Sequence, residues 1–175
     1  DIEKYVFDST EGAVQALRSP NYCARYLAWV RLHEAGTRAE KPLLSLLSDS
    51  NPRMRARALW LLGQIPGKEA TYIQRAIEDR NEDVRIVGIR LSDLVGHDTV
   101  ALIQQLTSDP SVRVRAVGAV HLRHHDTPAA ANAWACLAAV HDGVDRWYLE
   151  ALGTGCAKKE VEMYNYLHKK LNPGP

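Results

Sequence analysis

Apolar residues along the chain recur three and four positions apart, with polar and charged residues between them. This spacing places the apolar side chains on one face of a helix, and no segment alternates apolar and polar residues as a half-buried strand would. The pattern therefore predicts a chain of amphipathic α-helices with no sheet. The expected N-caps are Ser9, Thr37, Asp98 and Thr127, and the expected helix ends lie at Gly36, Gly67, Gly96 and Gly155.

The helical pattern also repeats about every 30 residues. Five segments align on one arginine, at Arg25, Arg55, Arg85, Arg115 and Arg146, with spacings of 30, 30, 30 and 31. A small or apolar residue follows each arginine by three positions, at Ala28, Ala58, Gly88, Gly118 and Leu149. Aspartates precede the middle three at the same period, at Asp49, Asp79 and Asp109. Such a repeat is typical of helix pairs that stack into a solenoid, because one pair alone cannot bury its apolar face.

The periodicity predicts an all-α fold in which helix pairs wind into an α–α superhelix. We expect one solenoid domain over residues 9–172, after an irregular lead-in over 1–8. Its five helix pairs are expected at about 9–36, 37–66, 67–96, 97–126 and 127–156. A last helix over about 157–171 is more polar, as expected for a cap whose outer face has no neighbour.

The phased Asp and Arg positions, best seen around "NPRMRARALWLLGQIPG" (51–67), resemble HEAT repeats of the short, 30-residue type. HEAT repeats form armadillo-like α-solenoids with an internal ladder of Asp and Arg. The resemblance implies that Asp49, Asp79 and Asp109 pair with Arg55, Arg85 and Arg115. An aspartate before a helix can also cap its N–H groups and meet the positive end of the helix dipole. Ser19 in the first repeat and Asp145 beside Arg146 in the fifth depart from the pattern, which weakens the expected ladder at its ends.

Three phrases resemble a narrower family: "SPNYCARYLAWVRLHEAG" (19–36), "NPRMRARALWLLGQIPG" (51–67) and "HDGVDRWYLEALGTG" (141–155). They are similar to the HEAT segment of very large planctomycete-type proteins, which combine a dehydrogenase-like propeller, HEAT repeats and a c-type cytochrome domain. The resemblance implies an extracytoplasmic location and a scaffold between catalytic and electron-transfer modules. The first residue, Asp1, and the final "NPGP" are interpreted as the ends of a piece of a larger protein. The chain contains no Cys-x-x-Cys-His haem signal, so no catalytic or haem-binding residue is carried over.

Charge and cysteine content narrow the classes of function. Lys and Arg total 22 against 21 Asp and Glu, so the chain as a whole has no strong attraction to polyanions. No apolar run approaches the roughly 20 residues of a membrane helix. Cys23, Cys136 and Cys156 are too far apart for a paired metal site, and we expect Cys23 and Cys136 to be buried thiols. We predict no cofactor.

Two segments in the last third contain candidate chemistry. His121 and His125 lie four residues apart and could hold a metal ion if a third ligand such as His141 joined them. We prefer a solvated helix end and predict no metal. In "DRWYLEALG" we expect Trp147 and Leu149 or Leu152 to fill the core, with Glu150 in solvent.

The preferred function is a non-enzymatic, monomeric scaffold that binds a protein partner or a neighbouring domain. The candidate contact residues are Arg57, Trp60 and Arg90, on the second helices of their pairs. The alternative is a nucleic-acid-binding HEAT-like protein of the DNA-glycosylase type, in which arginines around Trp60 would bind phosphates and bases. Acidic residues interleaved with these arginines argue against it. A bilin lyase-like HEAT protein is a further alternative, supported only by the repeat.

Overall fold

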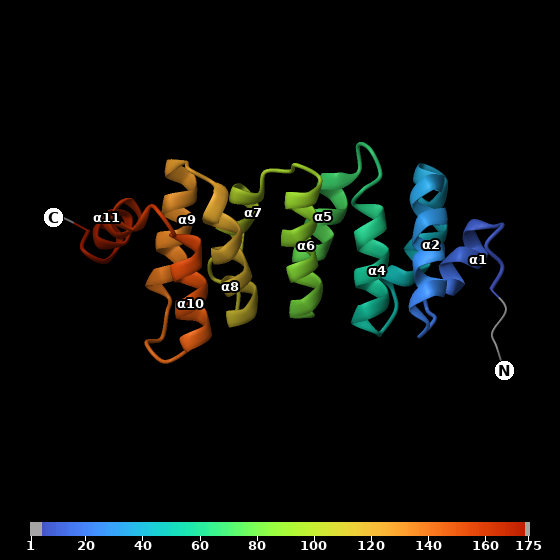
Figure 1. Cartoon of the computed structure of the whole chain (residues 1–175), viewed down its shortest axis with the longest axis horizontal. Coiled ribbons are helices and arrows are strands. Elements are labelled where there is room, and N and C mark those ends of the chain that lie inside the picture. The colour runs from blue at the N-terminus through green and yellow to red at the C-terminus, as the bar shows by residue number, and fades with distance from the viewer. Residues whose placement is uncertain (1–4, 174–175) are drawn as a thin grey trace. The chain divides into compact units, whose positions relative to one another are not determined.

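The computed structural model describes residues 5–173, and over these residues the chain is all-helical, with no strand (Figure 1). This confirms the predicted all-α class. Of the expected lead-in, residues 1–4 lie outside the described residues, whereas residues 5–8 are non-helical. The chain divides into two compact units, the first ending at His97 and the second beginning at Asp98. One continuous solenoid over 9–172 stays a prediction.

The first unit contains three helix pairs in sequence. The paired helices are α1 (Thr10–Ala16) with α2 (Tyr22–Ala35), α3 (Glu40–Leu47) with α4 (Pro52–Leu62), and α5 (Glu69–Ile77) with α6 (Glu82–Leu94). A 3-10 helix, η1 (Gly36–Ala39), leads into α3. Within this unit α4 contacts both α2 and α6, so the second helices of the pairs form one layer (Figure 1).

The second unit follows the same alternation. Its elements are α7 (Thr99–Gln105), α8 (Val112–His121), η2 (Leu122–His124), α9 (Pro128–Ala139), α10 (Arg146–Gly155) and α11 (Glu160–Leu171). Helix α8 packs on α10, and α9 packs on both α7 and α11. The final helix begins at Glu160, three residues later than expected.

Small residues at the repeated position allow the helices of the first unit to approach closely. Ala28 and Ala58 are fully buried, and Gly88 is buried as well. A Cβ added at Gly88 would lie 2.7 Å from Cγ2 of Ile77, which is too close for a real contact between α5 and α6. Leu149 departs from this series, because its side chain is 58% exposed.

The same hydrogen-bonded turn precedes the second helix of each of the first four pairs. Asp79 Oδ1 accepts from the N–H of Asn81 at 2.8 Å, and the Asn81 side chain then accepts from the first turn of α6. The same geometry recurs at Ser19–Asn21, Asp49–Asn51 and Asp109–Ser111. The aspartates therefore fold the turn, whereas the residue two positions later caps the helix. This corrects the expectation that the aspartates themselves are the caps.

The other predicted helix boundaries agree except at Thr37 and Gly67; α4 already ends at Leu62, five residues before Gly67, whereas α10 ends at Gly155 as expected. Ser9, Asp98 and Thr127 are the N-caps of α1, α7 and α9, and each side chain accepts a backbone N–H three residues on. Thr37 caps no helix, because it lies inside η1. Gly36, Gly67 and Gly96 have φ values of 55°, 79° and 68°, which glycine adopts most readily.

Candidate functional site

Arg55 joins two successive helix pairs in the first unit. Its Nε and Nη2 donate to the two carboxylate oxygens of Asp79 at 2.7 and 2.8 Å. Its Nη1 donates to the backbone carbonyl of Asp49 at 2.8 Å. The two side chains are only 8% and 12% exposed, so this bidentate ion pair is largely out of water.

The pairing scheme differs from the expected one. The Asp49 carboxylate accepts from Nη1 of Arg18 at 2.5 Å and does not bind Arg55. The repeated arginines also share a backbone contact: Arg25, Arg55, Arg85 and Arg115 each donate to the carbonyl six residues earlier. Each arginine therefore holds the turn that precedes its own helix. The aspartates at 49 and 79 bind an arginine from the preceding pair.

The scheme changes towards the C-terminus. Position 139, which lies 24 residues after Arg115 as Asp79 does after Arg55, is Ala139. The Arg115 guanidinium lies 5.2 Å from the centre of the Tyr148 ring, a cation–π contact. Arg146 is exposed and lies 3.6 Å from Glu150 on the same helix, so it takes no part in a link between pairs. Its expected place in the ladder is therefore wrong.

The ion pairs alter the pKa values of their members. Burial by itself would raise the pKa of Asp79, but hydrogen bonds from Arg55 and from the Asn81 N–H lower it overall. The pKa of Asp49 is lowered by the Asn51 N–H and by Arg18. The pKa of Arg55 is raised by its hydrogen bonds to Asp79. Both aspartates therefore stay ionised at neutral pH.

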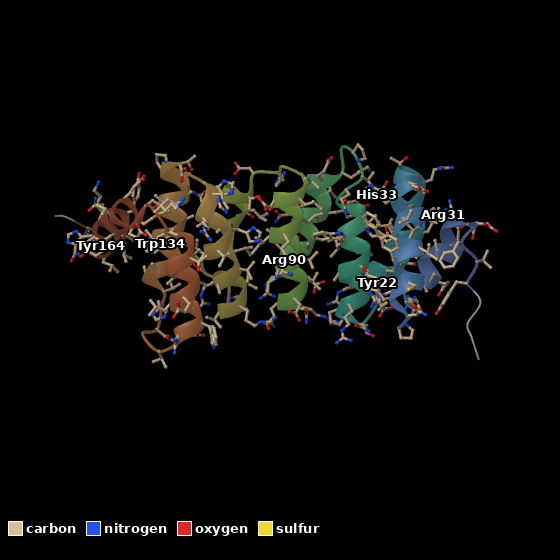
Figure 2. All side chains as sticks on the ribbon, in the orientation of Figure 1. Tyr22, Arg31, His33, Arg90, Trp134 and Tyr164 are labelled. Carbon is tan, nitrogen blue, oxygen red and sulfur yellow. The ribbon has the colours of Figure 1, made fainter. Side chains whose placement is uncertain are left out.

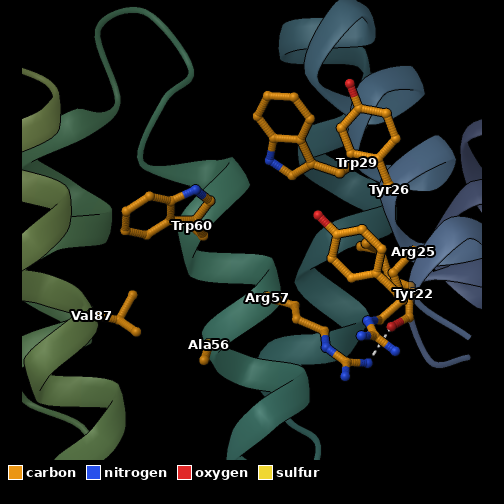
Figure 3. Close-up of a pocket in the computed structure, with 9 residues that line it drawn as sticks. Tyr22, Arg25, Tyr26, Trp29, Ala56, Arg57, Trp60 and Val87 are labelled. Carbon is orange, nitrogen blue, oxygen red and sulfur yellow. Dashed lines mark hydrogen bonds between the residues drawn. The ribbon is translucent and has the colours of Figure 1, made fainter. Parts of the chain in front are cut away.

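A second feature of the first unit is an open groove, called here the α2–α4 groove (Figure 3). Its lining residues are Leu17, Tyr22, Arg25, Tyr26, Trp29, Ala56, Arg57, Trp60 and Val87. Its volume is about 370 Å³, which is in the range of small-ligand sites. Most of the lining comes from α2 and α4, whose buried residues, such as Leu32 of α2 and Leu59 of α4, are not among the lining residues.

Aromatic rings form much of the groove wall. Tyr22 and Tyr26 are 71% and 54% exposed, although both follow the helical spacing of the apolar pattern. Trp29 stacks on His33, with ring centres 4.9 Å apart and an angle of 9° between the planes. Trp60 is half-buried on the α4 side (Figure 3). Large exposed rings in one concave place are typical of binding surfaces.

Arg57 brings positive charge into this apolar groove. Its Nη1 donates to the backbone carbonyl of Leu17, and its side chain is half-buried. Burial lowers the pKa of Arg57, and the neighbouring charges of Arg25 and Arg53 lower it further. Within residues 5–173, no carboxylate pairs with Arg57 or Arg25. The groove therefore combines aromatic surface with unneutralised positive charge.

The three predicted contact residues have different places. Arg57 and Trp60 line the α2–α4 groove, whereas Arg90 is exposed on α6 and is not among the lining residues (Figure 2). Sequence reasoning missed Tyr22, Tyr26 and Trp29. Their spacing of four and three residues on α2 was a usable signal, because it places all three on one helix face.

The second unit departs from two expectations about its side chains. Trp147 is 82% exposed, so its predicted place in the core is wrong. Tyr148 is buried instead, and its hydroxyl donates to the carbonyl of Leu137 at 2.7 Å. Leu152 is buried as expected. Helix α10 therefore turns its Tyr148 and Leu152 face to the core.

The segment with the clustered histidines, residues 121–125, lies at the C-terminal end of α8. The backbone carbonyls of Leu122 and His125 accept from Nζ of Lys159 at 3.0 and 2.7 Å. Lys159 thus closes the C-terminal end of α8 and η2. No group of three or more potential metal ligands occurs in the described part of the chain, His121 and His125 included.

The cysteines differ in exposure. Cys23 is exposed, so its expected burial is wrong; Cys136 is partly buried and Cys156 is buried. Burial raises the pKa of the Cys156 thiol.

Over residues 5–173, no helix is both long and apolar enough to cross a membrane.

Comparisons with known proteins leave the family open. No protein-family model matches the chain, and a search of curated proteins finds no significant match to it. The HEAT and planctomycete resemblances therefore remain interpretations of this chain's own residues.

Proposed function

We propose that this chain is a non-enzymatic interaction module of the HEAT-repeat solenoid type. Its α2–α4 groove binds a segment of a partner protein or of a neighbouring domain, and the chain itself is a monomer. The exposed aromatic wall formed by Tyr22 and Tyr26 beside Trp29 and Trp60 carries this proposal. Aromatic side chains bury a large area at a low cost in conformational entropy, which suits them to recognition.

The chemistry of the groove supports binding more than catalysis. Its lining holds two guanidinium groups, and its only hydroxyls are those of Tyr22 and Tyr26. General acid–base or nucleophilic catalysis needs a carboxylate, imidazole, thiol or activated hydroxyl near the bound molecule. Because most of the lining residues lie along α2 and α4, the groove is an elongated surface that a peptide segment can follow.

Nucleic acid is the second candidate, because the groove combines arginines with aromatic rings. Single-stranded nucleic acids bind to such surfaces through phosphate contacts and base stacking. The positive charge here is limited to Arg25 and Arg57, with Arg53 nearby. The near-zero net charge of the chain also gives little long-range attraction.

The experiment that tests the proposal is selection of peptides from a random display library on the immobilised chain. Peptides that occupy the groove should lose about tenfold or more in affinity for a Tyr22→Ala/Tyr26→Ala variant. Both tyrosines are more than half exposed, so the variant should keep its fold.

The matched control is Tyr164→Ala, which removes a tyrosine that is 61% exposed on α11 (Figure 2). It should leave peptide affinity unchanged. Failure to select any peptide whose binding depends on Tyr22 and Tyr26 would contradict the proposal. Micromolar binding of a single-stranded oligonucleotide that is lost in the same variant would favour the nucleic-acid alternative.

A further inference from the structure

The α2–α4 groove contains two cations without an anion. Arg57 and Arg25 both line it, and neither has a carboxylate partner in the part of the chain that the structure describes. Arg55, two residues away on the same helix, is instead bound by both oxygens of Asp79. A partly desolvated charge is unfavourable unless it is paired, so the groove is a favourable place for an incoming anion.

Arg57 also has hydrogen-bond donors to spare. A guanidinium carries five N–H donors in a planar fork. Within residues 5–173, only Nη1 of Arg57 donates to another residue, to the Leu17 carbonyl and at 3.8 Å to the Met54 sulfur. The Nε and Nη2 donors remain, and they have the geometry that binds a carboxylate with two hydrogen bonds.

The positive charge lies at one end of the groove. Figure 3 shows Arg25 and Arg57 extending towards each other, while Trp29 and Trp60 lie further along the helices. Around the tryptophans the lining carries no charge and includes the Tyr26 ring and Val87 of α6. A nucleic-acid strand carries a phosphate on every nucleotide and binds best to cations spread along its path. A peptide can instead place an acid at one end and apolar side chains at the other.

We propose that the α2–α4 groove recognises an acidic–apolar peptide segment. Its Asp or Glu carboxylate binds Arg57 and Arg25, and its neighbouring apolar side chain packs between Trp29 and Trp60. This inference rests on the proposed function, that of a groove for protein segments, and it specifies the chemistry of the partner. Arg57 is then the residue that determines specificity, and the aromatic rings supply most of the contact area.

The test uses the displayed-peptide selection with one further variant. Peptides selected on the wild-type chain should be enriched in Asp or Glu next to aromatic or aliphatic residues. A selected peptide should bind the wild-type chain about tenfold or more tightly than its Asn or Gln isostere, because charged hydrogen bonds are the stronger ones. Arg57→Met should remove most of this preference, with Arg25 retaining the rest, and should leave the affinity of the isostere unchanged. Unchanged isostere affinity also shows that the variant is folded.

Two controls separate recognition in the groove from general attraction. Arg90→Met removes an equal charge from the exposed face of α6, outside the groove lining, and should preserve the acidic preference. Arg57→Lys keeps the charge but loses the planar fork, and should retain part of the preference. If Arg90→Met and Arg57→Met have equal effects, overall charge attracts the peptide and the inference is wrong.

The remaining outcomes distinguish the two proposals. Selected peptides without acidic enrichment that still depend on Tyr22 and Tyr26 would overturn this inference and leave the groove as a peptide site. Absence of groove-dependent peptides would overturn both. Oligonucleotide binding that disappears in Arg57→Met would assign the groove to nucleic acid and would also overturn both.

Discussion

Arg55 and Arg57 lie two residues apart on α4, yet they belong to regions of different character. Arg55 faces the turns of its own and the following helix pair, where Asp79 and the Asp49 carbonyl occupy its donors. Arg57 faces the α2–α4 groove, where a single backbone carbonyl of the first pair and a methionine sulfur are its partners within residues 5–173. The two side chains are chemically identical and differ only in what the fold brings to them.

This difference separates a structural charge from an available one. An ion pair that is satisfied within the chain stabilises the junction between helix pairs and has nothing left for a ligand. A guanidinium that lacks an anion adds little to stability but can bind one from outside. Replacing each arginine in turn and measuring the free energy of unfolding and its pH dependence tests this difference.

The largest effect is expected for Arg55→Met. The change leaves the carboxylate of Asp79 without its main partner in a site that is only 12% exposed. Removing one member of such a buried pair costs about 3–5 kcal/mol in the free energy of unfolding, which urea denaturation measures. Arg53→Met on the same helix is the control; its exposed side chain should change stability by less than about 0.5 kcal/mol. Equal effects of the two substitutions would remove the structural role given to Arg55.

Low pH should reduce the difference in the free energy of unfolding between wild type and Arg55→Met. The pKa of Asp79 is lowered in the folded chain, so its contribution to stability is present above the ordinary Asp value of about 3.9. That contribution is lost as the pH falls through the lowered value. The stability difference should therefore be full at pH 7 and shrink steadily below about pH 4. A difference that stays constant down to pH 2 would mean that Asp79 is not the partner that matters.

A smaller effect is expected for Tyr72→Phe, which removes another hydrogen bond between two helix pairs of the first unit. The Tyr72 hydroxyl of α5 donates to Glu40 Oε1 of α3 at 2.7 Å, and its loss should cost about 1 kcal/mol. Burial, with the hydrogen bond and charge of Glu40, raises the pKa of Tyr72 to about 12. Because the folded pKa is raised, this stabilisation is present below about pH 10 and is lost as the pH rises towards 12. Burial also raises the pKa of Tyr148, so alkaline titration of tyrosinate absorbance should show one late-ionising tyrosine fewer in the variant than in wild type.

The smallest effect on stability is expected for Arg57→Met. The variant loses one hydrogen bond to the Leu17 carbonyl but keeps an aliphatic chain of similar length in the groove. Urea denaturation should show a change within about 1 kcal/mol of wild type. A loss as large as that of Arg55→Met would make Arg57 a structural residue and would erase the contrast between the two faces of α4.

The helical class and the repeat were readable from the sequence, because both depend on local periodicity. Apolar residues three and four apart place one face of each helix in the core, and the 30-residue phase of Arg25 to Arg115 marks equivalent positions. Arg57 and Trp60 were also predicted as surface residues of α4, and both line the groove. The caps Asn51 and Asn81 were within reach too, since they recur at the same period as the aspartates.

Tertiary packing decided which equivalent positions carry which role. Trp147 and Tyr148 are adjacent, and helical spacing alone allowed either to face the core; packing of α10 on α8 buries Tyr148 and leaves Trp147 82% exposed. Likewise, Arg55 pairs with the carboxylate of Asp79 from the following helix pair, 24 residues away, and not with its own Asp49. Periodicity specifies a residue's direction on its helix, but the ion pairs and the groove depend on distances between helices. Those distances are set by side-chain volumes across each contact, as at Gly88 against Ile77, and no local pattern contains them.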